Sequence, residues 1–134
     1  MSILVDTNVM LDIALKREPF LQHSALALAK ARKAGSTLLC ATSVTILHYF
    51  LRQKKGELGA RVFLRECLNA MPVAEVNLST LQGAVDGATS DFEDSVIAQS
   101  ALSASAQWIL TRDVADFSKS PVAAITPEDY LKLP

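Results

Sequence analysis

The chain has 134 residues, of which half are hydrophobic and a fifth are charged, and its net charge is −1. This composition excludes a disordered or fibrous protein, and the length predicts a single domain over residues 1–134. Its apolar runs are far shorter than the roughly 20 residues that span a bilayer, and no secretory signal pattern opens the chain, so we expect a cytoplasmic protein.

Strand and helix patterns alternate along the chain, which predicts an α/β fold with a mostly parallel sheet of four to five strands. Apolar runs predict strands over residues 3–5, 37–41, 73–76, 108–110 and 122–125. Helical patterns cover residues 9–16, 20–34, 43–55, 57–70, 80–88, 90–106 and 127–131. Gly35 is expected to end a helix, and Gly56 to break one. The helices should cover both faces of the sheet.

An acidic residue follows each of two predicted strands. Asp6 comes directly after the first apolar run, and Asp113 follows the run that ends at Leu110, with Asp116 three residues later. The carboxyl ends of parallel strands lie at one edge of a sheet, where ligands of open α/β folds bind. We therefore expect Asp6 and Asp113 to lie at the same edge.

A further acidic group opens the helix predicted over residues 90–106. Asp91 and Asp94 are three positions apart, so on a helix we expect them to face one cavity, whereas Glu93 should point well away from Asp91. Helix N-termini share the edge with strand C-termini, so this group should join Asp6. Crowded carboxylates repel one another unless a cation is bound, and Mg²⁺ prefers oxygen ligands. Such an ion lowers the pKa of bound water, so hydrolysis of a phosphodiester is the chemistry expected.

Each of these acids also has a structural interpretation. Asp6 could bond the amides of a turn, and Asp91 and Asp94 could form a helix cap with an acidic first turn. Asp113 or Asp116 could stabilise a turn or pair with Arg112, which lies beside them. The hypothesis of a functional site depends on the position of all three groups at one predicted edge.

Three motifs resemble those of the PIN domain family in order and spacing: residues 4–9 (LVDTNV), 91–94 (DFED) and 110–117 (LTRDVADF). Residues 121–131 resemble the C-terminal end of such domains. This resemblance spans nearly the whole chain. It implies a three-layer, Rossmann-like fold and an endoribonuclease that hydrolyses RNA phosphodiester bonds with Mg²⁺ or Mn²⁺. Small members are often VapC-like toxins of toxin–antitoxin pairs, which commonly form homodimers and are inhibited by an antitoxin protein.

The resemblance also implies roles for individual residues. The catalytic set implied is Asp6, Asp91, Asp94 and Asp113, and the metal ligands implied are Asp6, Asp94 and Asp113. The supporting groups implied, which orient carboxylates or water, are Asn8, Thr111 and Asp116.

One position departs from the family pattern. Many active members carry a Glu on the helix after the second strand, and the matching residue here is Ile46, with no acid between Glu18 and Glu57. Asp91, one turn before Asp94, is the group that would substitute. The alternative is a catalytically weak or inactive PIN-fold module that binds RNA or protein.

The charges are divided unevenly between the two halves of the chain. Residues 1–67 have a balance of +5 and residues 68–134 a balance of −6, which suits phosphates or an acidic partner in the first half and divalent cations in the second. Arg52, Lys54 and Lys55 could follow an RNA backbone, hold an acidic antitoxin segment, or be simply solvated.

A phosphohydrolase of the haloacid dehalogenase type is a less favoured function. It would also begin with an Asp at the first strand end, but needs a second Asp where Asn8 stands. It also needs a Lys before the last acidic pair, and none lies between Lys55 and Lys119. A phosphorylated receiver domain fits less well still, because no acidic pair opens the chain.

Overall fold

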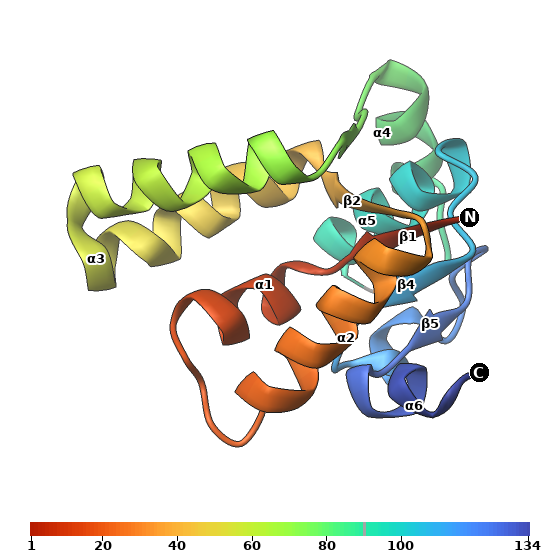
Figure 1. Ribbon diagram of the computed structural model, residues 1–134. Coiled ribbons are helices and arrows are strands. Elements are labelled where there is room, and N and C mark those ends of the chain that lie inside the picture. Colours follow the sequence, from red (N-terminus) through yellow and green to blue (C-terminus); the bar gives the residue numbers. More distant parts are fainter. Residues whose placement is uncertain (90) are drawn as a thin grey trace.

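Five parallel strands form the centre of the molecule (Figure 1). The computed structural model describes residues 1–89 and 91–134. Its elements are, in chain order, β1 (Ser2–Val5), α1 (Thr7–Ala14), α2 (Leu21–Ala34), β2 (Ser36–Cys40), α3 (Ala41–Ala70), β3 (Val73–Ala74), α4 (Leu78–Val85), α5 (Phe92–Ser103), β4 (Trp108–Leu110), the 3₁₀ helix η1 (Val114–Phe117), β5 (Ala124–Ile125) and α6 (Pro127–Lys132). The strand order is β3-β2-β1-β4-β5, and every neighbouring pair is parallel. The predicted parallel α/β fold is therefore confirmed.

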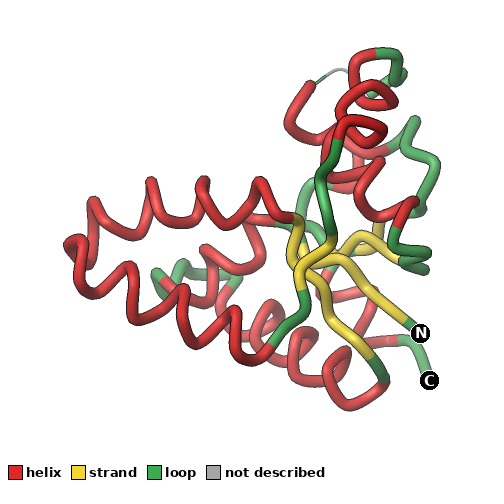
Figure 2. Tube along the Cα trace, turned by 90° about the horizontal axis from the view of Figure 1, so that it is seen from above, coloured by secondary structure: helices red, strands yellow, loops and turns green. Residues whose placement is uncertain are grey.

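Helices cover both faces of the sheet, so the fold has three layers (Figure 2). Ile3 and Val5 of β1 point into a core shared with α1, α2, α3 and α6. Leu4, between them, points into a second core shared with α4, α5 and η1. Side chains alternate between the faces of a strand, and here both faces are apolar. This is why the strands appear in the sequence as uninterrupted apolar runs.

The strands that follow β1 in the chain are added first on one side of it and then on the other. This topological switch point at β1 is where a ligand is expected to bind. The chain passes from β1 to β2 and β3 on one side, then returns to β4 and β5 on the other. In open α/β sheets a crevice opens at such a point, outside the carboxyl ends of the strands. The ends of β1 and β4, at Asp6 and Thr111, border this crevice.

α3 consists of two helices that meet at Gly56 and lie side by side, projecting from the sheet (Figure 1). Gly56 has φ 74° and ψ 170°, a conformation that is essentially restricted to glycine. A Cβ at Gly56 would meet nothing within 4 Å, so the backbone conformation, and not crowding, requires the glycine. Nε2 of His48 in the first half lies 2.8 Å from Oε2 of Glu57 in the second. The predicted break at Gly56 is confirmed.

Element boundaries differ from the predicted ones where side chains cap helices. α1 begins at Thr7 and not at Val9, because the Asp6 side chain accepts from the Thr7 N–H. The helix predicted from residue 90 begins at Phe92 after Asp91, and Ser90 itself lies outside the described residues. The 3₁₀ helix η1 was not predicted. Within the described parts of the chain, no helix is both long and apolar enough to cross a bilayer.

Candidate acidic site at the sheet edge

Asp6 lies at the carboxyl end of β1 and is held on both carboxylate oxygens. Its backbone N–H donates to the Leu110 carbonyl of β4 at 2.9 Å. Oδ1 accepts from the Thr7 N–H at 2.8 Å, and Oδ2 accepts from the buried Thr111 hydroxyl at 2.8 Å. Asp6 is only 6% exposed. A carboxylate so placed cannot turn away from the crevice.

Thr111 and Asn8 connect Asp6 with Asp113. Oγ1 of Thr111 accepts from the Asp113 N–H at 3.0 Å, while Nδ2 of Asn8 donates to Oδ2 of Asp113 at 2.8 Å. The network joins the ends of β1 and β4, which are 105 residues apart in the chain. The structure thus brings Asp6 and Asp113 to one edge, with Thr111 and Asn8 orienting them.

The N-terminus of α5 brings further carboxylates to this edge. Oδ1 of Asp91 caps the helix by accepting from the Asp94 N–H at 3.0 Å. The pKa of Asp94 is raised to about 7, mainly by burial and further by the charges of four other acids, Asp6, Asp91, Asp116 and Glu93. Asp94 therefore lies within electrostatic range of Asp6, which follows β1, and of Asp116 on η1.

Glu93, which helical spacing directs away from Asp91, still acts on this group through its charge. Burial raises the pKa of Glu93, and so does the charge of Asp91. The charge of Glu93 in turn raises the pKa of both Asp6 and Asp94. We define the acidic cluster as Asp6, Asp91, Glu93, Asp94, Asp113 and Asp116.

Burial is also the main cause of the unusual pKa of Asp6, which rises to about 6. The hydrogen bonds from Thr111 and Thr7 lower this pKa, while the charges of Asp113 and Glu93 raise it. Over residues 1–89 and 91–134, no Lys, Arg or His forms an ion pair with a member of the acidic cluster. The repulsion among these carboxylates is therefore not relieved by a neighbouring base.

These pKa values predict that the metal-free protein loses stability as the pH rises. Asp6 and Asp94 bind protons more tightly in the folded chain, at pKa about 6 and about 7, than in the unfolded chain, where Asp titrates at about 4. The linked stability is complete below the unfolded pKa and is lost as the pH rises through the folded values. We expect the free energy of unfolding in EDTA to fall by about 2 kcal/mol from pH 5 to pH 8. In this value the contribution of Asp94 is reduced, because solvent screens the charge of a partly exposed group.

Urea titrations at each pH measure this loss. The Asp94→Asn variant, which lacks one of the two groups, should show a smaller loss over the same range. A profile equally steep in both proteins, or flat in the wild type, would contradict the assignment.

The donor set of the acidic cluster fits a hydrated divalent cation. Among the residues that the structure describes, no three carboxylate, imidazole or thiol side chains are arranged as ready ligands of one metal ion. The cluster nevertheless offers oxygen atoms alone, with unrelieved negative charge. In the same described set, buried Oδ1 of Asn8 has no hydrogen-bond partner. Hydrated Mg²⁺ or Mn²⁺ would supply both the positive charge and the water donors that these groups lack.

The face of α3 nearest the cluster carries no acid. The Ser43 hydroxyl of α3 accepts from the Thr7 hydroxyl at 2.9 Å, directly beside Asp6. Ile46, one turn further along α3, shares this face and is half-buried. The carboxylate that the family pattern has at this position is therefore absent from the site.

Asp12, which is buried, and Arg112, which is partly exposed, form an ion pair that the sequence did not predict. Nε and Nη2 of Arg112 donate to Oδ2 and Oδ1 of Asp12 at 2.5 Å and 3.2 Å. Arg112 thus pairs with Asp12, and not with Asp113 or Asp116. The sequence signal for this pair was Asp12, an acidic residue within the apolar pattern of α1. Its partner Arg112 lies 100 residues away in the chain, so the pattern could not identify it.

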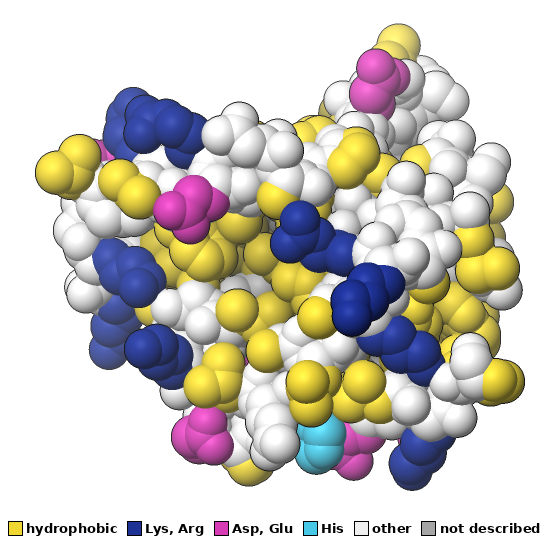
Figure 3. Space-filling model, in the orientation of Figure 1, with side chains coloured by type: hydrophobic (Ala, Val, Ile, Leu, Met, Phe, Trp, Pro, Cys, Tyr) yellow, Lys and Arg dark blue, Asp and Glu magenta, His cyan; other side chains and the backbone are white. Residues whose placement is uncertain are grey.

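Arg52, Lys54 and Lys55 do not join the acidic cluster. They are exposed on the half of α3 that leads to Gly56, and this half projects away from the sheet. Figure 3 shows several basic side chains on the face of the molecule that carries α3. A role of these three residues in RNA binding remains a prediction.

The fold is similar to that of solved toxin–antitoxin proteins. VapBC2 from Rickettsia felis, bound to a promoter DNA fragment, has a TM-score of 0.75 and 15% identity over 94% of this chain and 98% of that one. VapBC-1 from nontypeable Haemophilus influenzae has a TM-score of 0.75 and 15% identity over 96% and 99%. VapC20 from Mycobacterium tuberculosis, a sarcin–ricin loop cleaving toxin, has a TM-score of 0.68 and 13% identity over 80% and 86%.

The sequence itself matches a protein family. No curated protein matches the chain. A family profile described as a PIN domain matches residues 2–115, which include β1, α5, β4 and the whole of the acidic cluster except Asp116. The resemblance seen in the motifs is therefore confirmed, and the chain belongs to the PIN domain family.

Proposed function

We propose that this protein is a metal-dependent endoribonuclease that hydrolyses RNA phosphodiester bonds, and that it is the toxin of a toxin–antitoxin pair. The observation that carries the proposal is the acidic cluster, in which carboxylates that follow β1 and β4, open α5 and lie on η1 raise one another's pKa without an ion-pair partner among the described residues. Membership of the PIN domain family supports it. The likeness in fold to VapC20, a sarcin–ricin loop cleaving toxin, agrees with RNA as the substrate.

Asp6, Asp94 and Asp113 are the residues proposed to hold Mg²⁺ or Mn²⁺. When bound, such an ion lowers the pKa of water and offsets charge on a phosphoryl group. Thr111 fixes Asp6 and Asn8 fixes Asp113 through the hydrogen bonds described above. Asp91, besides contributing charge, caps α5, while Asp116 adds charge from η1.

We further propose that residues 1–134 act as one cytoplasmic domain, as a homodimer that an antitoxin protein inhibits. The likeness to the VapBC complexes supports the antitoxin. The exposed Arg52, Lys54 and Lys55 offer positive charge to either RNA or an acidic antitoxin segment. Light scattering of the purified protein measures the oligomeric state directly.

A second candidate function is a PIN-fold module that binds RNA or protein without cleaving it. Ile46 on the face of α3 beside the cluster favours this reading, because a site with one carboxylate fewer holds a cation less tightly. The two functions differ in whether the site binds metal at all.

Metal binding and metal-dependent cleavage test the proposal together. We expect Mn²⁺ to give a saturable heat of binding in calorimetry, and labelled RNA to be cut in Mn²⁺ but not in EDTA, because the cluster needs a cation to act. Cleavage that survives EDTA would point to a contaminating nuclease. An absence of binding heat at millimolar Mn²⁺ would favour the non-cleaving module.

A further inference from the structure

We propose that a hollow beside the acidic cluster binds a phosphate group of the RNA chain next to the phosphodiester that is cleaved. This inference rests on the proposed function, because it assigns a second subsite for the same RNA. The hollow has a volume of about 130 Å³ and is lined by Ala88, Thr89, Ala115, Asp116, Ser118 and Lys119. A cavity needs only about 10–15 Å³ by this measure to hold a water molecule, so the hollow has room for a phosphate group.

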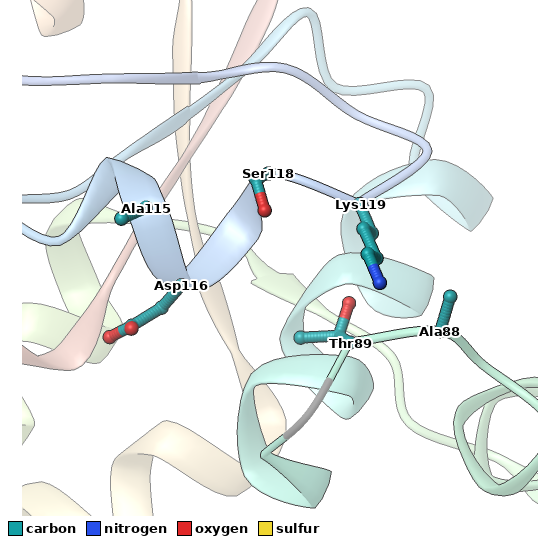
Figure 4. A pocket seen from close by; sticks show the side chains of 6 residues that line it. All are labelled: Ala88, Thr89, Ala115, Asp116, Ser118 and Lys119. Carbon is teal, nitrogen blue, oxygen red and sulfur yellow. The ribbon is translucent and has the colours of Figure 1, made fainter.

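Three hydrogen-bond donors gather at this hollow (Figure 4). The Lys119 ammonium and the Ser118 hydroxyl point into it from one wall, and the Thr89 hydroxyl points toward Lys119 from the other. The Asp116 carboxylate points away from the hollow. One ammonium and two hydroxyl groups are the complement of a phosphate, which offers acceptor oxygens and negative charge.

Hydrogen bonds hold both walls of the hollow in place. The carbonyl of Thr89 accepts from the hydroxyl of Ser95, which is buried on α5, at 3.1 Å. On the other wall, the Ser118 N–H donates to the Ala115 carbonyl at 3.2 Å, and Phe117 between them is buried in the core. These contacts connect one wall of the hollow to α5 and the other to η1.

Lys119 has a charge that the fold does not otherwise use. The Lys and Arg residues of the acidic half, residues 68–134, are Arg112, Lys119 and Lys132. Arg112 pairs with Asp12, and Lys132 lies 3.6 Å from Asp129. No ion pair of Lys119 occurs in the described part of the chain. Lys119 thus remains available to a ligand.

The hollow borders the acidic cluster, because the two share Asp116. Asp116 lines the hollow, and its charge also reaches Asp94. An RNA strand approaching six carboxylates is repelled, and a positive group at their border offsets this repulsion. The hollow is therefore placed to hold the backbone of an RNA whose neighbouring phosphodiester lies over the cluster.

Binding of RNA to Lys119→Met and to the matched control Lys132→Met tests the inference. Fluorescence anisotropy of labelled single-stranded RNA in EDTA, over a series of salt concentrations, measures affinity without cleavage. We expect Lys119→Met to bind roughly tenfold more weakly than the wild type, with a slope of log K against log salt that is smaller by about one. Lys132→Met should match the wild type, and Lys119→Arg should keep most of the affinity. RNAs of different sequence should lose affinity equally, since phosphate contacts carry no sequence information.

The outcomes separate this inference from the proposed function. If Lys119→Met keeps the affinity and salt slope of the wild type, or if both lysine variants weaken binding equally, the phosphate subsite is overturned while the nuclease proposal stands. If the wild type neither binds nor cleaves RNA, the proposed function fails and the subsite fails with it.

Discussion

We expect the Asp6→Asn substitution to lower the proposed RNA cleavage by a factor of about 100 or more and at the same time to stabilise the metal-free protein. Asn keeps the shape of the side chain, and its carbonyl oxygen can still accept from the Thr7 N–H that caps α1. It removes a buried charge that Asp113 and Glu93 repel. We expect a gain of about 1–2 kcal/mol in the free energy of unfolding in EDTA at neutral or higher pH.

Two measurements on the same preparations distinguish a functional from a structural role of Asp6. Cleavage of labelled RNA in Mn²⁺ gives the first, and urea unfolding in EDTA gives the second. Mn²⁺ should raise the stability of the wild type by mass action, and that of Asp6→Asn much less. Asp129→Asn, exposed on α6, is the matched control and should change neither cleavage nor the effect of Mn²⁺. Lost cleavage accompanied by lost stability would instead identify Asp6 as a structural cap.

The parallel sheet and the meeting of Asp6 with Asp113 could be predicted because both follow from local patterns. Strands buried on two faces are apolar at every position, and in a parallel sheet their carboxyl ends share an edge. No side-chain contact had to be known to place these two acids together. Gly56 could be predicted for a similar reason, since the helical pattern stops and resumes around a residue that tolerates positive φ.

The electrostatic effect of Glu93 on the other acids could not be predicted by the same reasoning. Its expected direction came from helical spacing, which describes side chains around the axis of a helix. Glu93 and Asp94 lie in the first turn of α5, and the carboxylates that they influence gather near the N-terminus. Acids in the first turn of a helix all lie near its N-terminus, whichever direction around the axis they take. Helical spacing alone therefore predicts too few of these acids as members of the acidic cluster.

Ion pairs between residues far apart in the chain could not be predicted from the sequence either. The pair of Asp12 and Arg112 is the example with the largest expected effect on stability. Asp12 is completely buried in α1, where Arg112 holds it with two hydrogen bonds and the Ser24 hydroxyl donates a third, longer one at 3.4 Å. The guanidinium carbon of Arg112 lies 4.0 Å from the ring centroid of Phe20. Arg112 stands between Thr111 and Asp113, so the pair ties the end of β4 to α1.

Arg112→Met should lower the free energy of unfolding by about 3–5 kcal/mol, because Asp12 is left as a buried charge without its partner. The double variant Asp12→Leu/Arg112→Met removes both charges and should recover a large part of this loss, so the two substitutions should be strongly non-additive. Urea unfolding followed by the fluorescence of Trp108, the one Trp in the sequence, measures each free energy. Arg32→Met, at an exposed position near the end of α2, is the control and should stay within about 0.5 kcal/mol of the wild type.

The double variant also shows whether the pair serves the acidic cluster as well as the fold. If Arg112 positions Thr111 and Asp113, a double variant of nearly native stability should still bind Mn²⁺ more weakly, by roughly 10-fold, as expected when a group that orients metal ligands is lost. Calorimetry at equal protein concentration measures the difference. Native Mn²⁺ affinity in the double variant would restrict the pair to a structural role, and additive losses of stability would show that Asp12 and Arg112 do not depend on each other.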